Sequence, residues 1–294
     1  MVVLGGTGFL GVPVLEAALR VRCGAGEVIS VARRSAARRS PLREVTFDLE
    51  RTEGIASLLD ELDPDVVLLL AAVARTDVCE REPDLARRLN AEAPAAVASW
   101  CARERRRLVH VSTDLVFSGE APERRYREDD AVAPVHVYGR TKARSEVDVL
   151  AAWPEALVVR LPLLCGDSRG KGVGASDSLL EAARAGRSSS LFVDEWRTPL
   201  DVDDAARALL ELAGQPVRGL LHLVGPWRLS RFELGHRVLS AAGFSEALAR
   251  ERIRPVTQAE LELVPPRPRD VSLDGTRALS LLSFQPRSFA LPRG

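Results

Sequence analysis

The sequence predicts a doubly wound parallel α/β fold, in which helices cover both faces of a parallel sheet. At the amino terminus, the apolar residues 1–4 lead directly into a glycine-rich turn and then into an apolar helical pattern that continues to Leu19. Residues 65–72 form an almost continuous apolar run, typical of a strand buried on both faces of a parallel sheet. Strand and helix patterns alternate along this part of the chain, which favours parallel strands joined by right-handed crossovers.

Length and composition indicate a globular protein of about two domains. The chain has 294 residues, of which 46% are hydrophobic and 28% are charged. Its formal net charge is zero, so no global field favours nucleic acid or an anionic membrane as a partner. The longest apolar run, residues 66–74, is shorter than the roughly 20 residues that a membrane span needs. The first residues also lack a signal-peptide pattern, and we expect a cytoplasmic protein.

Cysteine and histidine spacing gives no sign of a metal site. Cys23, Cys79, Cys101 and Cys165 are widely scattered, and the four histidines show no ligand spacing either. This arrangement is typical of reduced cysteines that pack in a core, rather than of a disulfide framework.

The first turn carries the pattern of a dinucleotide-binding site. Three glycines recur at every third position between the predicted strand and helix. Such glycines let the turn close, let a pyrophosphate approach the backbone and let the helix pack on the strand, while the helix start supplies N–H donors. The alternative is a purely structural turn. On the first interpretation, the cofactor contacts Gly5, Thr7, Gly8, Phe9, Leu10 and Gly11.

Two arginines indicate which dinucleotide is bound. Residues 27–32 form the second predicted strand, and Arg33 and Arg34 stand at its end, where an NAD-binding chain would place an acidic residue. The pair favours the 2′-phosphate of NADPH, with NADH as an alternative. Because arginine is abundant in this chain, the pair could equally be solvated charge.

The next two strands supply further candidate cofactor contacts. Residues 45–47 form a short strand that ends at Asp48 and Leu49, where the acid could hydrogen-bond an adenine amino group. Ala71 and Ala72 end the apolar run of the following strand, and we assign them to the cofactor as well.

Polar side chains follow the fifth predicted strand. Residues 83–106 predict a long helix, and residues 108–112 predict a buried strand that ends in Ser112, Thr113 and Asp114. In an open α/β sheet, ligands bind at the carboxyl ends of the strands, so these side chains are well placed for a site. Ordinary turn and capping chemistry is the alternative.

A scarce pair of residues follows at a predicted helix start. The chain has two tyrosines and two lysines, and Tyr138 and Lys142 stand four residues apart. One helical turn places the phenol and the ammonium on the same face. The pair indicates a catalytic site, and a solvated surface pair is the alternative.

These segments together resemble a known superfamily. GGTGFLG at 5–11, STDLVFSG at 112–119 and YGRTK at 138–142 resemble the extended short-chain dehydrogenases/reductases, and the second segment is similar to that of the dTDP-4-dehydrorhamnose reductase family. The resemblance continues in order over nearly the whole chain. It implies a Rossmann cofactor domain at 1–165, to which 198–224 returns, and a smaller, mostly C-terminal α/β substrate domain at 166–197 and 225–294.

The resemblance also implies roles for the polar residues. Tyr138 would protonate a ketone oxygen, and Lys142 would stabilise the phenolate and bind the nicotinamide ribose. Thr113 would hydrogen-bond and orient the carbonyl. Asn90, in the long predicted helix, would help to organise the site and the cofactor, with a plain helical polar residue as the alternative.

The substrate side shows both matches and departures. Dehydratases of the superfamily carry an acid after the position of Asp114, whereas this chain has Leu115, which favours simple carbonyl reduction. Trp196 stands in a segment that interrupts the pattern of the reductases, and Arg267 could clamp phosphates. Ser112, Asp114, Leu115, Trp196 and Arg267 are the predicted substrate contacts.

The sequence therefore predicts an NADPH-dependent reductase of the keto group of a nucleotide-linked deoxysugar. Two alternatives stay open: a reductase or epimerase of another carbonyl compound, and a non-catalytic NADP-binding regulatory subunit of the kind found in methionine adenosyltransferase. We expect a small-molecule substrate, with neither nucleic acid nor membrane as a partner. A homodimer is compatible with the sequence.

Overall fold

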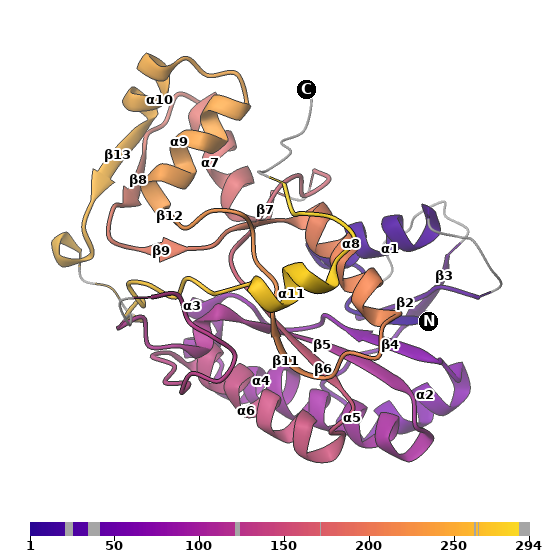
Figure 1. Ribbon diagram of the computed structural model, residues 1–294. Helices are drawn as coiled ribbons and strands as arrows, with labels where there is room; N and C mark the ends of the chain where they lie inside the picture. The colour runs from indigo at the N-terminus through magenta and orange to yellow at the C-terminus, as the bar shows by residue number, and fades with distance from the viewer. Residues whose placement is uncertain are drawn as a thin grey trace.

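A seven-stranded parallel sheet forms the centre of the molecule, with helices on both of its faces (Figure 1). The computed structural model describes residues 1–20, 26–34, 42–120, 124–170, 172–261, 263 and 265–287. The predicted doubly wound parallel α/β fold is confirmed. In spatial order, the strands are β11 (Gly219–His222), β6 (Leu157–Leu161), β5 (Arg107–Thr113), β4 (Val66–Leu69), β1 (Val2–Leu4), β2 (Ile29–Ala32) and β3 (Arg43–Thr46).

The central strands are apolar on both faces because each face packs against helices. Val2 and Leu4 of β1 belong to the core on one face, and Val3 belongs to the core on the other, as the alternation of side chains along a strand requires. The first face is covered by α2 (Ile55–Leu62), α5 (Ala93–Glu104) and α6 (Val137–Ala152), and the second by α1 (Gly11–Arg20) and α8 (Val202–Ala213).

A smaller layer packs around a hydrophobic core of its own. In this layer β8 and β13 pair in parallel, and β9 pairs with β12 in the antiparallel sense. A further short parallel pair, β7 with β10, lies at the boundary with the large sheet. The elements are α7 (Ala175–Arg184), α9 (Arg231–Ala241), α10 (Glu246–Arg252), β7 (Leu164–Cys165), β8 (Ser189–Phe192), β9 (Trp196–Arg197), β10 (Leu200–Asp201), β12 (Leu229–Ser230) and β13 (Ile253–Val256).

The last described helix returns to the large sheet. Helix α11 (Thr276–Leu281) packs beside β11, and Ala278 is fully buried in the core that β11 shares with α8. This placement differs from the assignment of all of 225–294 to the small domain. The physical reason is that the helix buries its apolar side against an otherwise uncovered edge of the sheet. The division into two domains stays a prediction.

The predicted long helix at 83–106 is interrupted. It consists of α4 (Pro83–Arg87), a π-helical turn (Arg88–Glu92) and α5. Pro94 follows the turn and has no N–H to donate to the carbonyl of Asn90, which breaks the regular ladder at that point. The turn places Asn90 in the interior, with no exposed surface.

Residues 70–75 lie outside regular structure. The predicted strand at 65–72 ends at Leu69, and the segment that follows reaches the short helix α3 (Thr76–Arg81).

Cys79, Cys101 and Cys165 are buried free thiols, and Cys23 lies outside the described residues. Among the described residues, no helix has the length and apolarity that crossing a membrane requires.

Candidate active site

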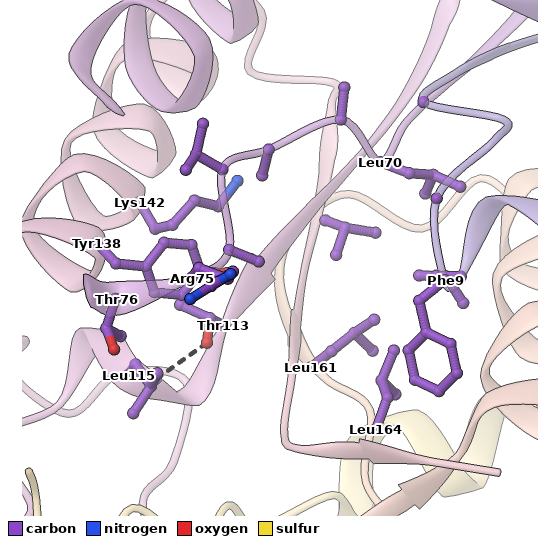
Figure 2. A pocket seen from close by; sticks show the side chains of 18 of the residues that line it. Phe9, Leu70, Arg75, Thr76, Thr113, Leu115, Tyr138, Lys142, Leu161 and Leu164 are labelled. Atoms are coloured by element: carbon purple, nitrogen blue, oxygen red, sulfur yellow. Dashed lines mark hydrogen bonds between the residues drawn. The ribbon is translucent and has the colours of Figure 1, made fainter. Parts of the chain in front are cut away.

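One cavity of about 890 Å³ runs along the carboxyl edge of the large sheet. One end is lined by the glycine turn after β1, the middle by the ends of β4 and β5 and the start of α6, and the other end by the small layer. In Figure 2, Phe9 lies on the glycine-turn side of the cavity, and Tyr138 and Lys142 lie on the opposite side.

The cofactor end depends on glycines at two positions. Gly5 has a positive φ of 96°, and a Cβ there would lie 2.7 Å from the backbone nitrogen of Ala71. A Cβ on Gly11 would lie 2.2 Å from the carbonyl oxygen of Gly5. The turn therefore packs backbone against backbone, which leaves its outer side as a cradle for a phosphate group. Of the predicted cofactor residues, the cavity wall contains Gly5, Thr7, Gly8, Phe9, Leu10, Gly11, Arg33, Asp48, Leu49, Ala71 and Ala72.

The two predicted arginines are placed differently. Arg33 borders the cavity, with a guanidinium nitrogen 4.0 Å from a carboxylate oxygen of Glu50. Arg34 is exposed and is not part of the cavity wall. Of the two, Arg33 is the one that lines the cavity, and its contact with a phosphate of the cofactor stays a prediction.

Tyr138 and Thr113 face each other at the middle of the cavity. Both side chains are buried, with 8% and 6% of the residue exposed. Burial raises the pKa of the Tyr138 phenol well above its usual range, while the neighbouring Thr113 hydroxyl acts in the opposite direction. A phenol of this kind stays protonated near neutral pH and can act as a proton donor.

Thr113 is held by the backbone that follows it. Its Oγ1 accepts a hydrogen bond from the backbone nitrogen of Leu115 at 3.2 Å, which caps the short 3-10 turn Asp114–Val116. The same hydroxyl donates a hydrogen bond to Oδ1 of Asp114 at 3.2 Å. The turn thus fixes the side-chain rotamer that points Thr113 towards Tyr138.

Helix α6 positions Tyr138 and Lys142. His136 is its N-cap, and Nδ1 of that histidine accepts a hydrogen bond from the backbone nitrogen of Gly139 at 3.0 Å. Lys142 is 1% exposed, and burial lowers its pKa to about 7, opposed by the charge of Glu146. The expected lowering of the Tyr138 pKa by Lys142 is not seen, because burial dominates at the phenol and Nζ of Lys142 is turned to within 3.2 Å of Nε2 of His110.

Ser112 borders the cavity, but its hydroxyl is engaged elsewhere. Its Oγ donates to Oε1 of Glu146 at 2.5 Å, and Arg160 of β6 binds both oxygens of the same carboxylate, at 2.9 and 2.7 Å. The arrangement differs from the predicted substrate contact because Glu146, one turn beyond Lys142, competes for the hydroxyl. Through these bonds, Glu146 joins α6 to Ser112 on β5 and to Arg160 on β6.

Asn90 acts from behind the cavity wall. Its Oδ1 accepts from the backbone nitrogen of Val73 at 2.8 Å, and its Nδ2 donates to the carbonyl oxygen of Val73 at 3.1 Å and to Oγ1 of Thr141 at 3.2 Å. It is not among the residues that line the cavity. Asn90 therefore joins the segment after β4 to the turn of α6 between Tyr138 and Lys142.

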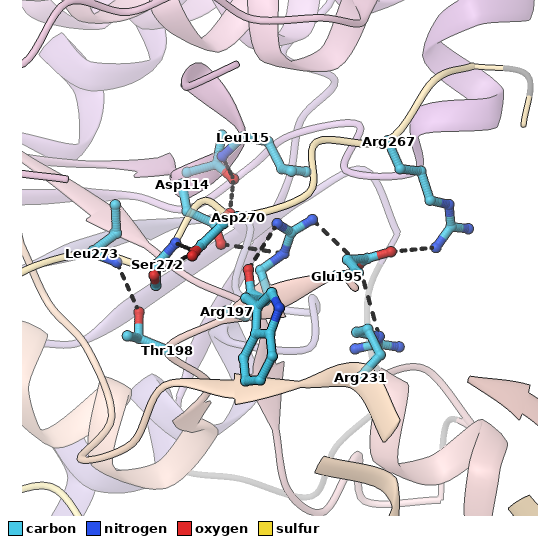
Figure 3. Close-up of polar contacts among 12 residues, drawn as sticks. Asp114, Leu115, Glu195, Arg197, Thr198, Arg231, Arg267, Asp270, Ser272 and Leu273 are labelled. Atoms are coloured by element: carbon cyan, nitrogen blue, oxygen red, sulfur yellow. Dashed lines mark hydrogen bonds and ion pairs between the residues drawn. The ribbon is translucent and has the colours of Figure 1, made fainter. Parts of the chain in front are cut away.

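The far end of the cavity contains a cluster of charges (Figure 3). Glu195 is bound at 3.3 Å by Arg197 and at 3.4 Å by Arg267, with Arg231 at 3.9 Å. Nε of Arg197 also lies 3.6 Å from Oδ2 of Asp114. Burial raises the pKa of Asp114 to about 6, and Arg197 opposes that rise. Of the predicted substrate residues, Asp114, Leu115 and Arg267 line this end.

Trp196 lies outside the cavity wall. It is on β9, where Arg228 stacks over its ring with the guanidinium carbon 4.0 Å from the ring centre. Successive strand residues point in opposite directions, so Arg197 faces the cavity instead. Sequence reasoning missed Glu195 and Arg231, because they belong to no motif and arginine is common throughout the chain.

Comparison with known proteins shows the family of this chain. A family model described as the RmlD substrate binding domain matches residues 1–291. The chain belongs to this family. The predicted resemblance to the extended short-chain dehydrogenases/reductases is therefore confirmed.

Several curated relatives are similar over most of the chain. A probable low-salt glycan biosynthesis reductase of Haloferax volcanii is 33% identical, covering 80% of this chain and 76% of the relative. A dTDP-4-dehydrorhamnose reductase of Mycobacterium tuberculosis is 39% identical, covering 69% of this chain and 66% of the relative. The methionine adenosyltransferase 2 subunit beta of Pongo abelii is 29% identical, covering 78% and 69%.

Solved structures of the RmlD type share the fold. A dTDP-4-dehydrorhamnose reductase from Yersinia enterocolitica superposes with a TM-score of 0.82 at 26% identity, covering 98% of this chain and 94% of that one. A dTDP-4-dehydrorhamnose reductase from Bacillus anthracis, in complex with NADP, gives a TM-score of 0.81 at 22% identity, with coverage of 98% and 94%.

Proposed function

We propose that the protein is an NADPH-dependent reductase of the keto group of a nucleotide-linked deoxysugar. The observation that carries the proposal is that Thr113, Tyr138 and Lys142, from two different elements, line the middle of one cavity whose end is a glycine cradle. Relatives named as reductases support it. The chain is accordingly an NAD(P)-dependent oxidoreductase, acting on a ketone and the corresponding alcohol.

The residues present fit a dinucleotide. The turn after β1 leaves a cradle that a Cβ at Gly5 or Gly11 would disrupt, and the carboxylate of Asp48 borders the same end of the cavity. Arg33 is placed for a 2′-phosphate, which favours NADPH over NADH. When bound, NADPH supplies the hydride.

The chain's own groups supply the proton and the orientation. The phenol of Tyr138 gives its proton to the carbonyl oxygen of the substrate as the carbon is reduced, so that a secondary alcohol forms. Thr113 donates a hydrogen bond to the same oxygen and fixes its position. Lys142 binds the nicotinamide ribose from the next turn of α6, and its Nζ is held by His110 rather than directed at the phenol.

The charged end of the cavity favours reduction of an anionic substrate. Arg197, Arg231 and Arg267 surround Glu195, an excess of positive charge that suits the diphosphate of a nucleotide sugar. Glu195 is held by these guanidinium groups and is a poor candidate for a base that removes a proton from the sugar. Leu115 provides no carboxylate either, so elimination of water is disfavoured.

A second candidate is a regulatory NADP-binding subunit. It is favoured by the similarity to a methionine adenosyltransferase beta subunit. This alternative predicts cofactor binding without turnover. The buried arrangement of Tyr138 with Thr113 weighs against it, since a binding role alone gives no reason to hold a protonated phenol beside a hydroxyl group.

The test is NADPH oxidation with a panel of dTDP-, UDP- and GDP-linked 4-keto sugars, followed by absorbance at the nicotinamide band. Simple ketones without a nucleotide are the control. We expect turnover with at least one nucleotide-linked sugar. Turnover of simple ketones alone would shift the function to another carbonyl substrate, and NADPH binding without any turnover would favour the regulatory alternative.

A further inference from the structure

The ammonium of Lys142 is buried with few hydrogen-bond partners. Its side chain lines the cavity at 1% exposure, and within the described residues its hydrogen-bond partner is Nε2 of His110, at 3.2 Å. The nearby carboxylate of Glu146 is already bound by Ser112 and Arg160. An ammonium removed from water needs acceptors, so the contact with His110 matters to it more than a contact at the surface would.

His110 is placed to accept and not to donate. It lies on β5 with no exposed surface, and burial together with the charge of Lys142 keeps its pKa well below the usual range. The ring is therefore neutral. An ammonium can only donate, so Nε2 accepts and the ring proton is on Nδ1, which is buried and has no hydrogen-bond partner among the described residues.

Ser145 completes the arrangement. Its Oγ lies 3.0 Å from the same Nε2 and donates to the carbonyl oxygen of Lys142 at 2.8 Å. That second bond uses the only hydroxyl proton of Ser145, which leaves Nε2 free to accept from Lys142. Seen from Lys142, the titratable or charged groups are His110 on β5, Tyr138 and Glu146 on α6, and, beyond Glu146, Arg160 on β6.

We propose that His110 is a positioning residue, which holds the ammonium of Lys142 through Nε2 and keeps it charged at the wall of the cavity. His110 is not among the residues that line the cavity, and it acts through Lys142. The role rests on the proposed function only in that a reductase needs the charged ammonium beside Tyr138. The contact itself can be tested without any substrate.

The composition makes a direct measurement simple. The chain has two lysines, Lys142 and Lys171, so lysine labelled with ¹³C at Cε gives two signals, and a Lys171→Arg variant assigns them. Lys171 lies outside the described residues. The Lys142 signal is then followed as a function of pH, which gives the pKa of Lys142 directly. The titration is carried out on the unmodified protein and on the His110→Phe and His110→Gln variants.

We expect the His110→Phe variant to lower the Lys142 pKa by about one pH unit, because a hydrogen bond to a charged group is lost. His110→Gln keeps an acceptor and should restore most of the shift. Ser145→Ala is the matched control, since it removes the neighbouring hydroxyl but leaves Nε2, and it should leave the pKa nearly unchanged. An unchanged Lys142 pKa in His110→Phe would overturn the proposal.

A measurement on the unmodified protein guards against a variant that does not fold. In ¹⁵N-histidine spectra, His110 should show an unprotonated Nε2 and a protonated Nδ1 at neutral pH. A proton on Nε2 would contradict the proposal. If the lysine shift is found while no sugar is reduced, the proposed function fails and the role of His110 in positioning Lys142 stands.

Discussion

Oδ2 of Asp114 lies 3.6 Å from Nε of Arg197, and both side chains are almost fully buried at the substrate end of the cavity. Asp114 follows Thr113, the last residue of β5, and Arg197 belongs to the two-residue strand β9 in the small layer. The contact therefore joins the end of β5, where we propose that the carbonyl is bound, to the small layer. It also sets the charge that a substrate meets beside Thr113.

Asp114→Asn should change how stability depends on pH. The pKa of Asp114 is raised from 3.8 to about 6, so its contribution to stability is fully present below pH 4 and is lost as the pH rises through 6. The amide stays neutral, so between pH 4 and pH 8 we expect the unmodified protein to lose about 1–3 kcal/mol more unfolding free energy than the variant loses. Urea unfolding at the two pH values measures the difference. Equal changes in both proteins would contradict the raised pKa.

Tyr138→Phe should abolish reduction while the cofactor still binds. Loss of the general acid is expected to lower kcat by about 10²- to 10⁴-fold. The phenyl ring fills the same buried space, so NADPH affinity should change little. Turnover with a keto sugar and fluorescence titration with NADPH give the two quantities. A kcat close to that of the unmodified protein would show that another group donates the proton.

Arg33→Ala and Arg34→Ala form a matched pair. Arg33 borders the cavity and Arg34 does not, although they are adjacent and both exposed. We expect Arg33→Ala to weaken NADPH binding by about tenfold, a loss typical of a phosphate contact, and to leave NADH binding unchanged. Arg34→Ala should affect neither. Equal effects of the two substitutions would mean that both arginines are only solvated charge.

Gly5→Ala tests the cradle at the cofactor end. A Cβ would lie 2.7 Å from the backbone of Ala71, at a φ of 96° that an alanine avoids. The change should cost about 2–4 kcal/mol in unfolding free energy and weaken NADPH binding. Gly214→Ala is the control, because at that position φ is −83° and the nearest atom lies 3.6 Å from the new Cβ. Denaturant unfolding of both variants provides the comparison.

Glu146→Gln tests the buried pair beneath α6. The change leaves the guanidinium of Arg160 without its bidentate carboxylate partner, in a site where the two side chains are only 2% and 5% exposed. Breaking such a pair typically costs about 3–5 kcal/mol. We expect a loss of this size by urea unfolding. The exposed pair of Arg250 with Glu246 on α10 serves as the control, and Glu246→Gln should leave stability unchanged within error.

Short-range patterns accounted for the fold and for much of the candidate site. The strand, glycine turn and helix at the amino terminus follow from residues that are neighbours in the chain, and the spacing of Tyr138 and Lys142 follows from one turn of α6. The polar residues after β5 reach the cavity because parallel strands all end at one edge of the sheet. Each of these features depends on a periodicity that can be read along the sequence.

The sequence by itself determined the fold class, the glycine turn at the cofactor end, and the grouping of Thr113 with Tyr138 and Lys142. Only the tertiary structure decided that Arg197, and not Trp196, faces the cavity, because a strand of two residues shows no periodicity from which a direction could be read. It alone placed His110 against Lys142 and Glu195 among three arginines. These contacts join residues on different elements, and the packing of those elements, not the order of the chain, brings the charges together.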